Sequence, residues 1–323
     1  MIEAIDLTKE FGDFVAVHNV CVAVPEGEVL AFLGPNGAGK TTTVRMLGSI
    51  LKPTRGYARI AGYDTVKDAK SVRQVIGLLT EFPGLYLRMK GLEYLSFFGE
   101  LQGMPRDIIQ NRSEELLRRF ELWEARDKQI GVYSKGMKQK LTLVRAMLHD
   151  PQVLFLDEPT SAMDPHSAKL VRDAIVDLRQ EKRTIVLCTH NLAEAELLAD
   201  RIAIIRRGQV IADGTPVALK QRLLGDPMME LRLAGPMNGL VKYLDEKVKV
   251  VTYGVDWVRY TVSDPTQFNP RLLADLARQD TPVITLSEVA RSLEEVYLRI
   301  VESDQQLEAI KAGAGPTISV EVN

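Results

Sequence analysis

The sequence predicts an α/β domain over residues 1–224, followed by a small α+β domain over 225–303 and a flexible tail over 304–323. In the first domain, short β-branched runs alternate with longer amphipathic segments, the pattern of successive strands and helices. Several of these runs are apolar throughout, as expected for parallel strands buried on both faces. After Gly225 the runs become shorter, and the tail is polar and rich in glycine.

The elements of the first domain follow from this alternation. Strands are predicted at Ile2–Leu7, Val20–Val24, Val29–Leu33, Ile76–Leu79, Val153–Leu156, Thr184–Cys188, Ile202–Ile205 and Val210–Ala212. Helices are predicted at Lys40–Ile50, Gly91–Gln102, Arg106–Phe120, Gly136–His149, His166–Gln180 and Leu192–Leu198. Residues 83–149 lack a clear strand, so they are predicted to form a helical subdomain inserted into the α/β core.

The second domain is predicted to follow the order β-α-β-β-α-β with a closing helix, which is the split ferredoxin-like pattern. The elements are a strand Met229–Leu233, a helix Met237–Glu246, strands Val248–Tyr253 and Trp257–Val262, a helix Pro270–Gln279, a strand Val283–Leu286 and a helix Ser292–Ser303.

Composition argues against several classes of protein. The net charge of −2 gives no sign of a basic nucleic-acid surface. Apolar runs such as Val153–Leu156 are far shorter than the ~20 residues that span a bilayer, and the charged N-terminus is unlike a signal peptide. Cys21 and Cys188 sit in apolar runs, where small buried residues are expected, and two cysteines cannot form a disulfide framework. A cytoplasmic, reducing location is therefore predicted.

The clearest motif directly follows the predicted strand at Val29–Leu33 and precedes a helix. Its sequence, Gly-Pro-Asn-Gly-Ala-Gly-Lys-Thr, matches G-x-x-x-x-G-K-[ST], in which backbone N–H groups and a helix N-terminus surround a phosphate. Lys40 is expected to reach the β- and γ-phosphates, and Thr41 to offer its hydroxyl to Mg²⁺. The residues predicted to surround the phosphates are Gly34, Pro35, Asn36, Gly37, Ala38, Gly39, Lys40, Thr41 and Thr42.

A second acidic motif supplies the remaining parts of a nucleotide-hydrolysing site. The apolar run Val153–Leu156 leads directly into Asp157 and Glu158. Asp157 is predicted to help hold Mg²⁺, and Glu158 to align the attacking water beside the γ-phosphate.

These motifs, in this order, resemble the ATP-binding subunits of ABC (ATP-binding cassette) transporters over residues 1–224. The resemblance implies an ABC cassette of the P-loop NTPase fold that binds ATP and Mg²⁺. Phe11 matches the aromatic position that stacks on adenine, where tyrosine is usual. Glu81 falls at the Q-loop glutamine, so it keeps an oxygen ligand for Mg²⁺ but adds negative charge.

The segment Tyr133–Met137, with sequence YSKGM, resembles the family's LSGGQ signature, with Lys135 in place of a glycine. The resemblance implies that Ser134 and Gly136 contact the γ-phosphate bound to an opposite subunit. A second ATPase subunit, either an identical chain or a paralogue, is therefore expected in a head-to-tail dimer.

Two further positions match family motifs. Asp164 matches the D-loop, which in the family crosses the dimer interface and here is taken as part of the nucleotide site. His190, directly after a predicted strand, matches the switch histidine that contacts the γ-phosphate. The resemblance implies ATP-driven dimer closure, followed by hydrolysis with water aligned by Glu158 and His190.

Three stretches resemble a branch of the family that exports drugs, polysaccharides, lipids or ions such as sodium from bacteria. They are Gly77–Met104, the signature YSKGMKQKL, and ARSLEEVYLRIVES at Ala290–Ser303, which resembles the motif closing that branch's extra C-terminal domain. A polytopic membrane permease subunit is expected to dock near Glu81–Met104. Candidate contacts are Phe82, Tyr86 and Tyr94, for which packing in the core is an alternative. The chain is thus predicted to lie peripherally on the inner face of the cell membrane.

Two alternatives stay open. One is the ATPase of an importer or of a lipoprotein-release complex, although such cassettes more often keep the Q-loop glutamine and LSGGQ. The other is a soluble ABC protein acting on ribosomes or DNA. Those proteins usually carry two cassettes or a long inserted coiled coil, and this sequence has neither.

Overall fold

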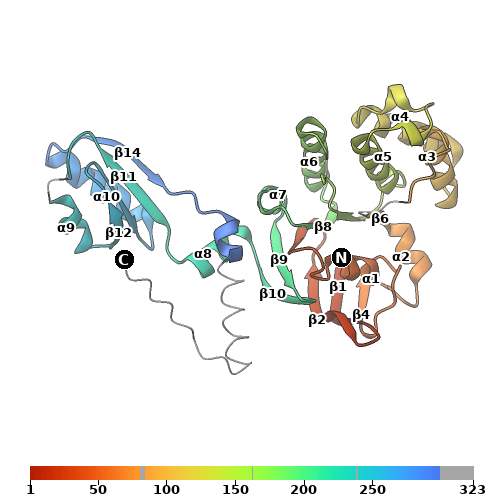
Figure 1. Ribbon diagram of the computed structural model, residues 1–323, viewed down its shortest axis with the longest axis horizontal. Helices are drawn as coiled ribbons and strands as arrows, with labels where there is room; N and C mark the ends of the chain where they lie inside the picture. Colours follow the sequence, from red (N-terminus) through yellow and green to blue (C-terminus); the bar gives the residue numbers. More distant parts are fainter. Residues whose placement is uncertain (81–83, 162, 238, 299–323) are drawn as a thin grey trace. The chain divides into compact units, whose positions relative to one another are not determined.

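The protein is described here by a computed structural model, in which its chain forms two compact units (Figure 1). The structure describes residues 1–80, 84–161, 163–237 and 239–298. The first unit is Met1–Pro216 and the second begins at Val217, and each has its own hydrophobic core. Within the described residues, no helix is long and apolar enough to cross a membrane.

A six-stranded sheet with the strand order β10-β9-β3-β8-β7-β6 forms the centre of the first unit. β3 pairs in parallel with β8 and β9, β7 pairs in parallel with β6 and β8, and β10 runs antiparallel to β9. Every residue of β3, β7 and β8 is buried, as their uniformly apolar sequences predict. The strands are β3 (Val29–Leu33), β6 (Ile76–Leu79), β7 (Val153–Asp157), β8 (Thr184–Thr189), β9 (Arg201–Arg206) and β10 (Gln209–Gly214).

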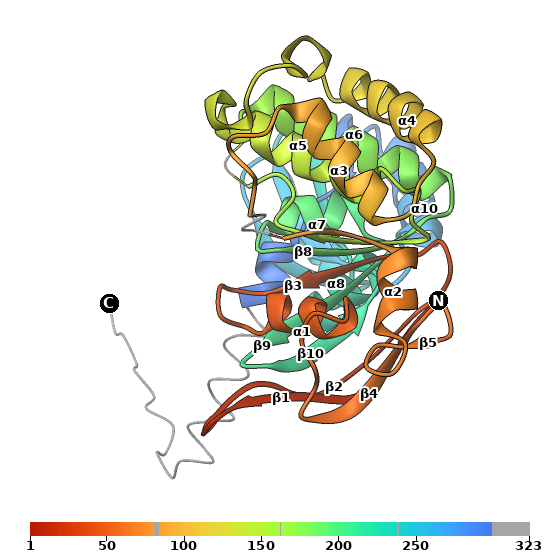
Figure 2. The same ribbon diagram turned by 90° about the vertical axis from the view of Figure 1, so that its right-hand side faces the viewer.

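A four-stranded antiparallel sheet with the order β2-β1-β4-β5 shares a core with the central sheet. Helix α1 (Lys40–Leu47) lies between the two sheets (Figure 2) and contributes Val44, Met46 and Leu47 to this core. The helix therefore has protein on both sides, which fixes the loop that precedes it. The strands are β1 (Ile2–Phe11), β2 (Phe14–Val24), β4 (Arg55–Ile60) and β5 (Tyr63–Asp64).

The remaining elements of the first unit are helical. Between residues 84 and 149 the described chain contains helices and no strand. The α-helices there are α3 (Gly91–Leu101), α4 (Arg106–Arg119) and α5 (Lys135–Met147), with the 3₁₀ segments η1 (Trp123–Ala125) and η2 (Ile130–Val132). The others are α2 (Ala69–Val75), α6 (Pro165–Gln180) and α7 (Leu192–Leu198).

The second unit contains an antiparallel sheet with the strand order β12-β13-β11-β14. Its core joins alternate residues of β11 and β13, such as Leu231, Val258 and Tyr260, to Leu272 and Leu276 of α10. The elements are α8 (Pro216–Leu224), β11 (Met228–Leu233), α9 (Leu240–Asp245), β12 (Lys249–Tyr253), β13 (Trp257–Thr261), α10 (Pro265–Arg278) and β14 (Val283–Glu288). A helical stretch follows at 293–298. The rest of the predicted helix Ser292–Ser303, and the predicted tail 304–323, lie outside the described residues.

Some elements were not predicted from the sequence. β4, β5 and α2 lie in a region where no element was expected, and the hairpin of β1 and β2 is longer than predicted. In β4 only Ala58 and Ile60 are buried, so the strand carries a weak apolar pattern and owes its place to pairing with β1.

The predicted start of α10 was wrong. The helix begins at Pro265, not at Pro270, because the Asp264 side chain accepts hydrogen bonds from the backbone N–H groups of Thr266 and Gln267. Pro270 then falls inside the helix. Proline is favoured at the first helical position, and this chain offers two candidates for it.

Candidate active site

The predicted phosphate loop connects β3 to α1, so the strand–loop–helix context of the motif is present. Gly37 and Gly39 have φ angles of 80° and 105°, which other residues rarely adopt. A Cβ at Gly39 would also lie 2.7 Å from the carbonyl oxygen of Ala16 on β2. Glycine is therefore required at residue 39 both by the backbone angle and by the close approach of the neighbouring strand.

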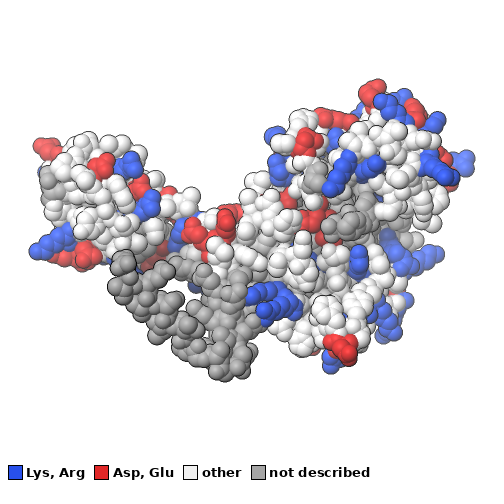
Figure 3. Space-filling model, viewed as in Figure 1, with Lys and Arg blue, Asp and Glu red and all other residues white. Residues whose placement is uncertain are grey.

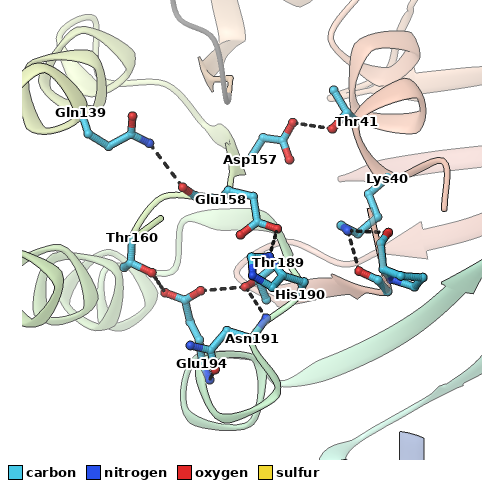
Figure 4. Close-up of polar contacts among 12 residues, drawn as sticks. Lys40, Thr41, Gln139, Asp157, Glu158, Thr160, Thr189, His190, Asn191 and Glu194 are labelled. Carbon is cyan, nitrogen blue, oxygen red and sulfur yellow. Dashed lines mark hydrogen bonds and ion pairs between the residues drawn. The ribbon is translucent and has the colours of Figure 1, made fainter. Parts of the chain in front are cut away.

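Lys40 and Thr41, the first residues of α1, place two functional groups beside this loop. Lys40 is buried, and its Nζ donates hydrogen bonds to the carbonyl oxygens of Gly34 at 2.6 Å and Pro35 at 3.1 Å. The Thr41 hydroxyl donates to Oδ2 of Asp157 at 2.7 Å (Figure 4). Asp157, at the end of β7, is 1% exposed.

Thr41 and Asp157 together form a pair of adjacent oxygen ligands. Mg²⁺ prefers oxygen ligands and is usually held by one or two carboxylates together with substrate phosphates and waters. Among the residues that the structure describes, no group of three or more His, Cys, Asp or Glu side chains could hold a metal by itself. The hydroxyl oxygen of Thr41 and the carboxylate of Asp157 fit the ligand chemistry of Mg²⁺.

Glu158 and His190 come from two neighbouring strand ends and meet in front of the loop. Oε1 of Glu158 lies 2.7 Å from Nδ1 of His190, and the His190 side chain is more exposed, at 57% against 12%. Glu158 has a φ of 52°, a strained conformation for a residue with a side chain. The backbone N–H of Glu158 donates to the Cys188 carbonyl at 2.9 Å, and the backbone carbonyl of Glu158 accepts a hydrogen bond from Nε2 of Gln139 at 3.3 Å.

A cavity of about 350 Å³ brings most of the predicted site residues together. It is lined by Phe14, Ala16, Asn36, Gly37, Ala38, Gly39, Lys40, Thr41, Thr42, Asp157 and Glu158. Gly34 and Pro35 contribute the carbonyl groups that bind Lys40. The phosphate loop, the Thr41–Asp157 pair and Glu158 thus face one space.

Phe14 lies in the wall of this cavity, whereas Phe11, which is predicted to stack on adenine, is not among its lining residues. The two residues pair directly across the hairpin of β1 and β2, so their side chains lie on the same face of the sheet. Both are exposed, Phe11 at 50% and Phe14 at 65%. The ammonium group of Lys9 lies over the Phe11 ring, 5.1 Å from its centroid. The sequence resemblance gave no reason to single out Phe14.

Ser134, Gly136 and Asp164 do not line the cavity. Ser134 caps α5 by accepting a hydrogen bond from the Met137 N–H at 3.1 Å, and Asp164 caps α6 by accepting one from the Ser167 N–H at 3.0 Å. An added Cβ at Gly136 would lie 3.9 Å from Oδ2 of Asp164, so these two residues are neighbours. At the start of each helix, some backbone N–H groups have no partner within the helix and can bind an acceptor from outside it.

The predicted permease contacts differ in their environments. Tyr86 is exposed, but Tyr94 is fully buried, so for Tyr94 the alternative of packing in the core is confirmed. Its hydroxyl accepts a hydrogen bond from Arg145 at 2.8 Å and its ring packs against Phe98. Glu81 and Phe82 lie outside the described residues.

The two cysteines also differ. Cys188 on β8 is buried, and burial, with a contribution from the charge of Asp157, raises the pKa of its thiol well above the usual value. Cys21 on β2 is exposed, and its thiol donates to Oδ1 of Asp6. The prediction that Cys21 is buried was wrong because it lies on an outward-facing position of an alternating strand.

Four polar residues around Glu158 and His190 were not predicted: Gln139, Thr160, Thr189 and Glu194 (Figure 4). The sequence offers one relevant pattern, the spacing of Asn191 and Glu194. That spacing is typical of a helix N-terminus, so it predicts a helix cap and does not indicate a role at the site.

Comparison with known proteins agrees with this geometry. The family model described as ABC transporter matches residues 17–161. The chain is 36% identical to the daunorubicin/doxorubicin resistance ATP-binding protein DrrA of Streptomyces peucetius, over 93% of this chain and 92% of that protein. The chain belongs to the ATP-binding proteins of ABC transporters. It is accordingly an ABC ATPase, in agreement with the resemblance found in the sequence.

Other similarities extend this assignment. The ABC ATPase is 33% identical to the Nod factor export ATP-binding protein I of a Rhizobium species (strain N33), over 94% of this chain and 98% of that protein. Its fold is similar to that of the cassette MJ0796, solved as a dimer in a post-hydrolysis state with ADP and Pi. That match has a TM-score of 0.62 and 25% identity, and covers 67% of this chain and 98% of the other.

Proposed function

We propose that this ABC ATPase powers an exporter, as the subunit that binds and hydrolyses ATP for a separate membrane permease. The observation that carries the hydrolytic part is the Glu158–His190 contact of 2.7 Å at the cavity that Lys40, Thr41 and Asp157 also face. The export part is supported by similarity to a Nod factor export protein along nearly the whole chain, second unit included.

In the proposed reaction, the phosphate loop and Lys40 bind the phosphates of ATP. The Glu158 carboxylate accepts a hydrogen bond from a water molecule and orients its oxygen toward the γ-phosphorus, while His190 holds the carboxylate and reaches the γ-phosphate. The water oxygen bonds to the γ-phosphorus as the bond from that phosphorus to the bridging oxygen of the β-phosphate breaks. One water proton passes to the Glu158 carboxylate and the other stays on the phosphate, giving ADP and inorganic phosphate.

Mg²⁺ is the proposed metal. Thr41 and Asp157 would hold it, because their oxygens are adjacent and Asp157 is buried at the end of β7. When bound, it supplies positive charge that neutralises the phosphate oxygens during transfer. Glu81 stays a predicted additional ligand.

A second cassette is proposed to complete the site. Ser134 and Gly136 lie at the start of α5 and do not line the phosphate-loop cavity of their own chain. A helix N-terminus favours an anion, so this surface suits a nucleotide bound to another subunit, with Asp164 beside it. The dimeric state of the similar MJ0796 cassette supports this proposal. The second subunit is either an identical chain or a paralogue.

The permease is proposed to dock beside the predicted region Glu81–Met104. A mainly apolar cavity of about 210 Å³ lies there, with Ile50, Leu78, Phe98 and Leu101 in its lining. Ile50 and Leu101 are 56% and 71% exposed, and exposed apolar surface of this kind suits a protein partner.

Because the partner would be a membrane permease, the proposed location of the protein is cytoplasmic, peripheral on the inner face of the membrane.

Nucleic acid is not a proposed partner. Over the helical segment at the upper right of Figure 3, acidic and basic side chains are interspersed, whereas nucleic-acid surfaces gather basic residues on one face.

We also propose a domain organisation: an α/β cassette over 1–224 with a helical subdomain at about 83–149, and a ferredoxin-like domain over 225–303. The element order from β11 to β14 and the strand order β12-β13-β11-β14 support the ferredoxin-like assignment.

The experiment that tests the proposed function is affinity purification of the full-length Glu158→Gln variant with MgATP from detergent-solubilised membranes. We expect a stoichiometric polytopic membrane protein to copurify. Ribosomal or DNA-repair proteins without a membrane partner would overturn the exporter assignment in favour of a soluble ABC ATPase. Transport by the copurified complex in vesicles of known orientation then separates export from import.

A further inference from the structure

A buried carboxylate that takes no part in the proposed chemistry lies behind the site. Glu194, on the first turn of α7, is only 3% exposed. Its Oε1 accepts a hydrogen bond from the Thr160 hydroxyl at 2.6 Å, and its Oε2 accepts one from the Thr189 hydroxyl at 2.9 Å. Burying a carboxylate is strongly unfavourable unless hydrogen-bond donors satisfy its oxygens. The hydroxyl groups of Thr160 and Thr189 supply these donors, so both are needed to keep Glu194 buried.

The two hydroxyls belong to the two chain segments that carry the proposed catalytic residues. Thr160 lies two residues after Glu158, and Thr189 immediately precedes His190. Glu194 is thus bonded to both chain segments whose side chains meet at 2.7 Å (Figure 4).

The hydrogen bonds around Thr189 leave little freedom. Its hydroxyl donates to Glu194 and accepts from the N–H of Asn191 at 3.0 Å. The Asn191 side chain in turn accepts from the N–H of Glu194 at 3.1 Å. This closed ring fixes the chain on both sides of His190, while Gln139 holds the carbonyl of Glu158 from α5.

We infer that Glu194 is a positioning residue, which holds the Glu158 and His190 segments at the separation that hydrolysis requires. This inference rests on the proposed roles of Glu158 and His190. Because a misplacement of about 1 Å can lower a rate ~10²-fold, losing either bond should reduce the rate of hydrolysis more than the affinity for ATP.

The test compares full-length variants by kcat and KM for MgATP, by the Kd for ATP and by melting temperature. Thr160→Val removes one hydroxyl while keeping the side-chain volume, and Thr160→Ser keeps the hydroxyl. We expect kcat to fall about 10-fold or more in Thr160→Val and in Glu194→Gln, with the Kd for ATP changed less than about twofold. Thr160→Ser should retain most of the wild-type kcat.

The matched control is Glu196→Gln, the same chemical change two residues further along α7. We expect its kcat to stay within about twofold of the wild-type value. Wild-type kcat in both Thr160→Val and Glu194→Gln would overturn the inference, and so would a loss of kcat that only follows a loss of folded protein. The proposed function fails separately, if the wild-type chain itself does not hydrolyse ATP.

Discussion

At the scale of single residues, the backbone of Glu158 is held by neighbouring elements, while its carboxylate faces the cavity and contacts His190. Its N–H bonds to β8, its carbonyl accepts from Gln139, and only its side chain faces the cavity and His190. A substitution at this residue can therefore change the chemistry while leaving the surrounding fold intact.

We expect Glu158→Gln to bind ATP with unchanged affinity and to hydrolyse it ~10²–10⁴ times more slowly, because the amide cannot act as a base toward the attacking water. Single-turnover hydrolysis and ATP binding measure the two effects. Asp157→Asn is the comparison, since it should weaken the metal-dependent part of ATP binding as well. Near-normal turnover of Glu158→Gln would contradict the role assigned to Glu158.

A second prediction at this scale concerns Phe14 and the adenine base of ATP. Since Phe14 and not Phe11 lines the cavity, Phe14→Ala should weaken ATP binding about fivefold or more through lost stacking on the base. Phe14→Tyr, which keeps the ring, should bind ATP like the wild type, and pyrophosphate, which has no base, should bind all of these chains equally. If Phe11→Ala weakens ATP binding and Phe14→Ala does not, the adenine stacks on Phe11.

At the scale of elements, the N-terminus of α5 carries the proposed contact with a second subunit. Ser134→Arg places a bulky cation where the partner's nucleotide would lie, so it should abolish ATP-dependent dimerisation, measured by size exclusion in the Glu158→Gln background. The affinity of the monomer for ATP should not change, because Ser134 does not line its own cavity. Ser134→Ala is the matched control for the loss of the cap alone, and unchanged dimerisation by Ser134→Arg would contradict the two-subunit site.

The start of α10 makes the second unit sensitive to pH. Hydrogen bonds from the Thr266 hydroxyl and the Gln267 N–H hold the pKa of Asp264 below its ordinary value of 3.8. The charged cap therefore stabilises the folded unit fully above that value, and its contribution is lost as the pH falls through the lowered pKa. Asp264→Asn should lower the melting temperature at pH 6, and the difference from wild type should shrink as the pH falls below about 3.8. A difference that does not vary with pH would contradict the role of the charge.

Elements with a strong apolar pattern could be predicted from the sequence. The residues of β3, β7 and β8 are uniformly apolar, and they were enough to predict these strands. The phosphate loop between β3 and α1 could likewise be predicted from its own sequence. β4 could not be predicted, since a half-exposed strand depends on a partner strand far away in the sequence. The contacts of Glu194 and Phe14 could not be predicted either. Thr160 is far in the sequence from Thr189 and Glu194, and Phe14 is far from Gly37, so these residues come together only in the folded domain.

At the scale of the whole molecule, two separate cores predict two unfolding events. Leu231 is fully buried in the core of the second unit and Val186 in that of the first. Leu231→Ala should destabilise the second unit by about 2–5 kcal/mol and move one calorimetric transition, while Val186→Ala moves the other. A single transition that shifts as one in both variants would show that the units unfold together.

The contrast between the two cysteines provides a reporter of the state of the chain. In the folded protein a thiol reagent should modify Cys21 alone, because Cys188 is buried on β8, where it pairs with Asp157 of β7, and burial raises its thiol pKa. Modification of a second thiol would then mark the moment at which β8 and the adjoining β7 separate. The rate of that second labelling step, followed with and without ATP, would report how much the nucleotide protects the centre of the cassette against opening, in a chain that needs no engineered probe.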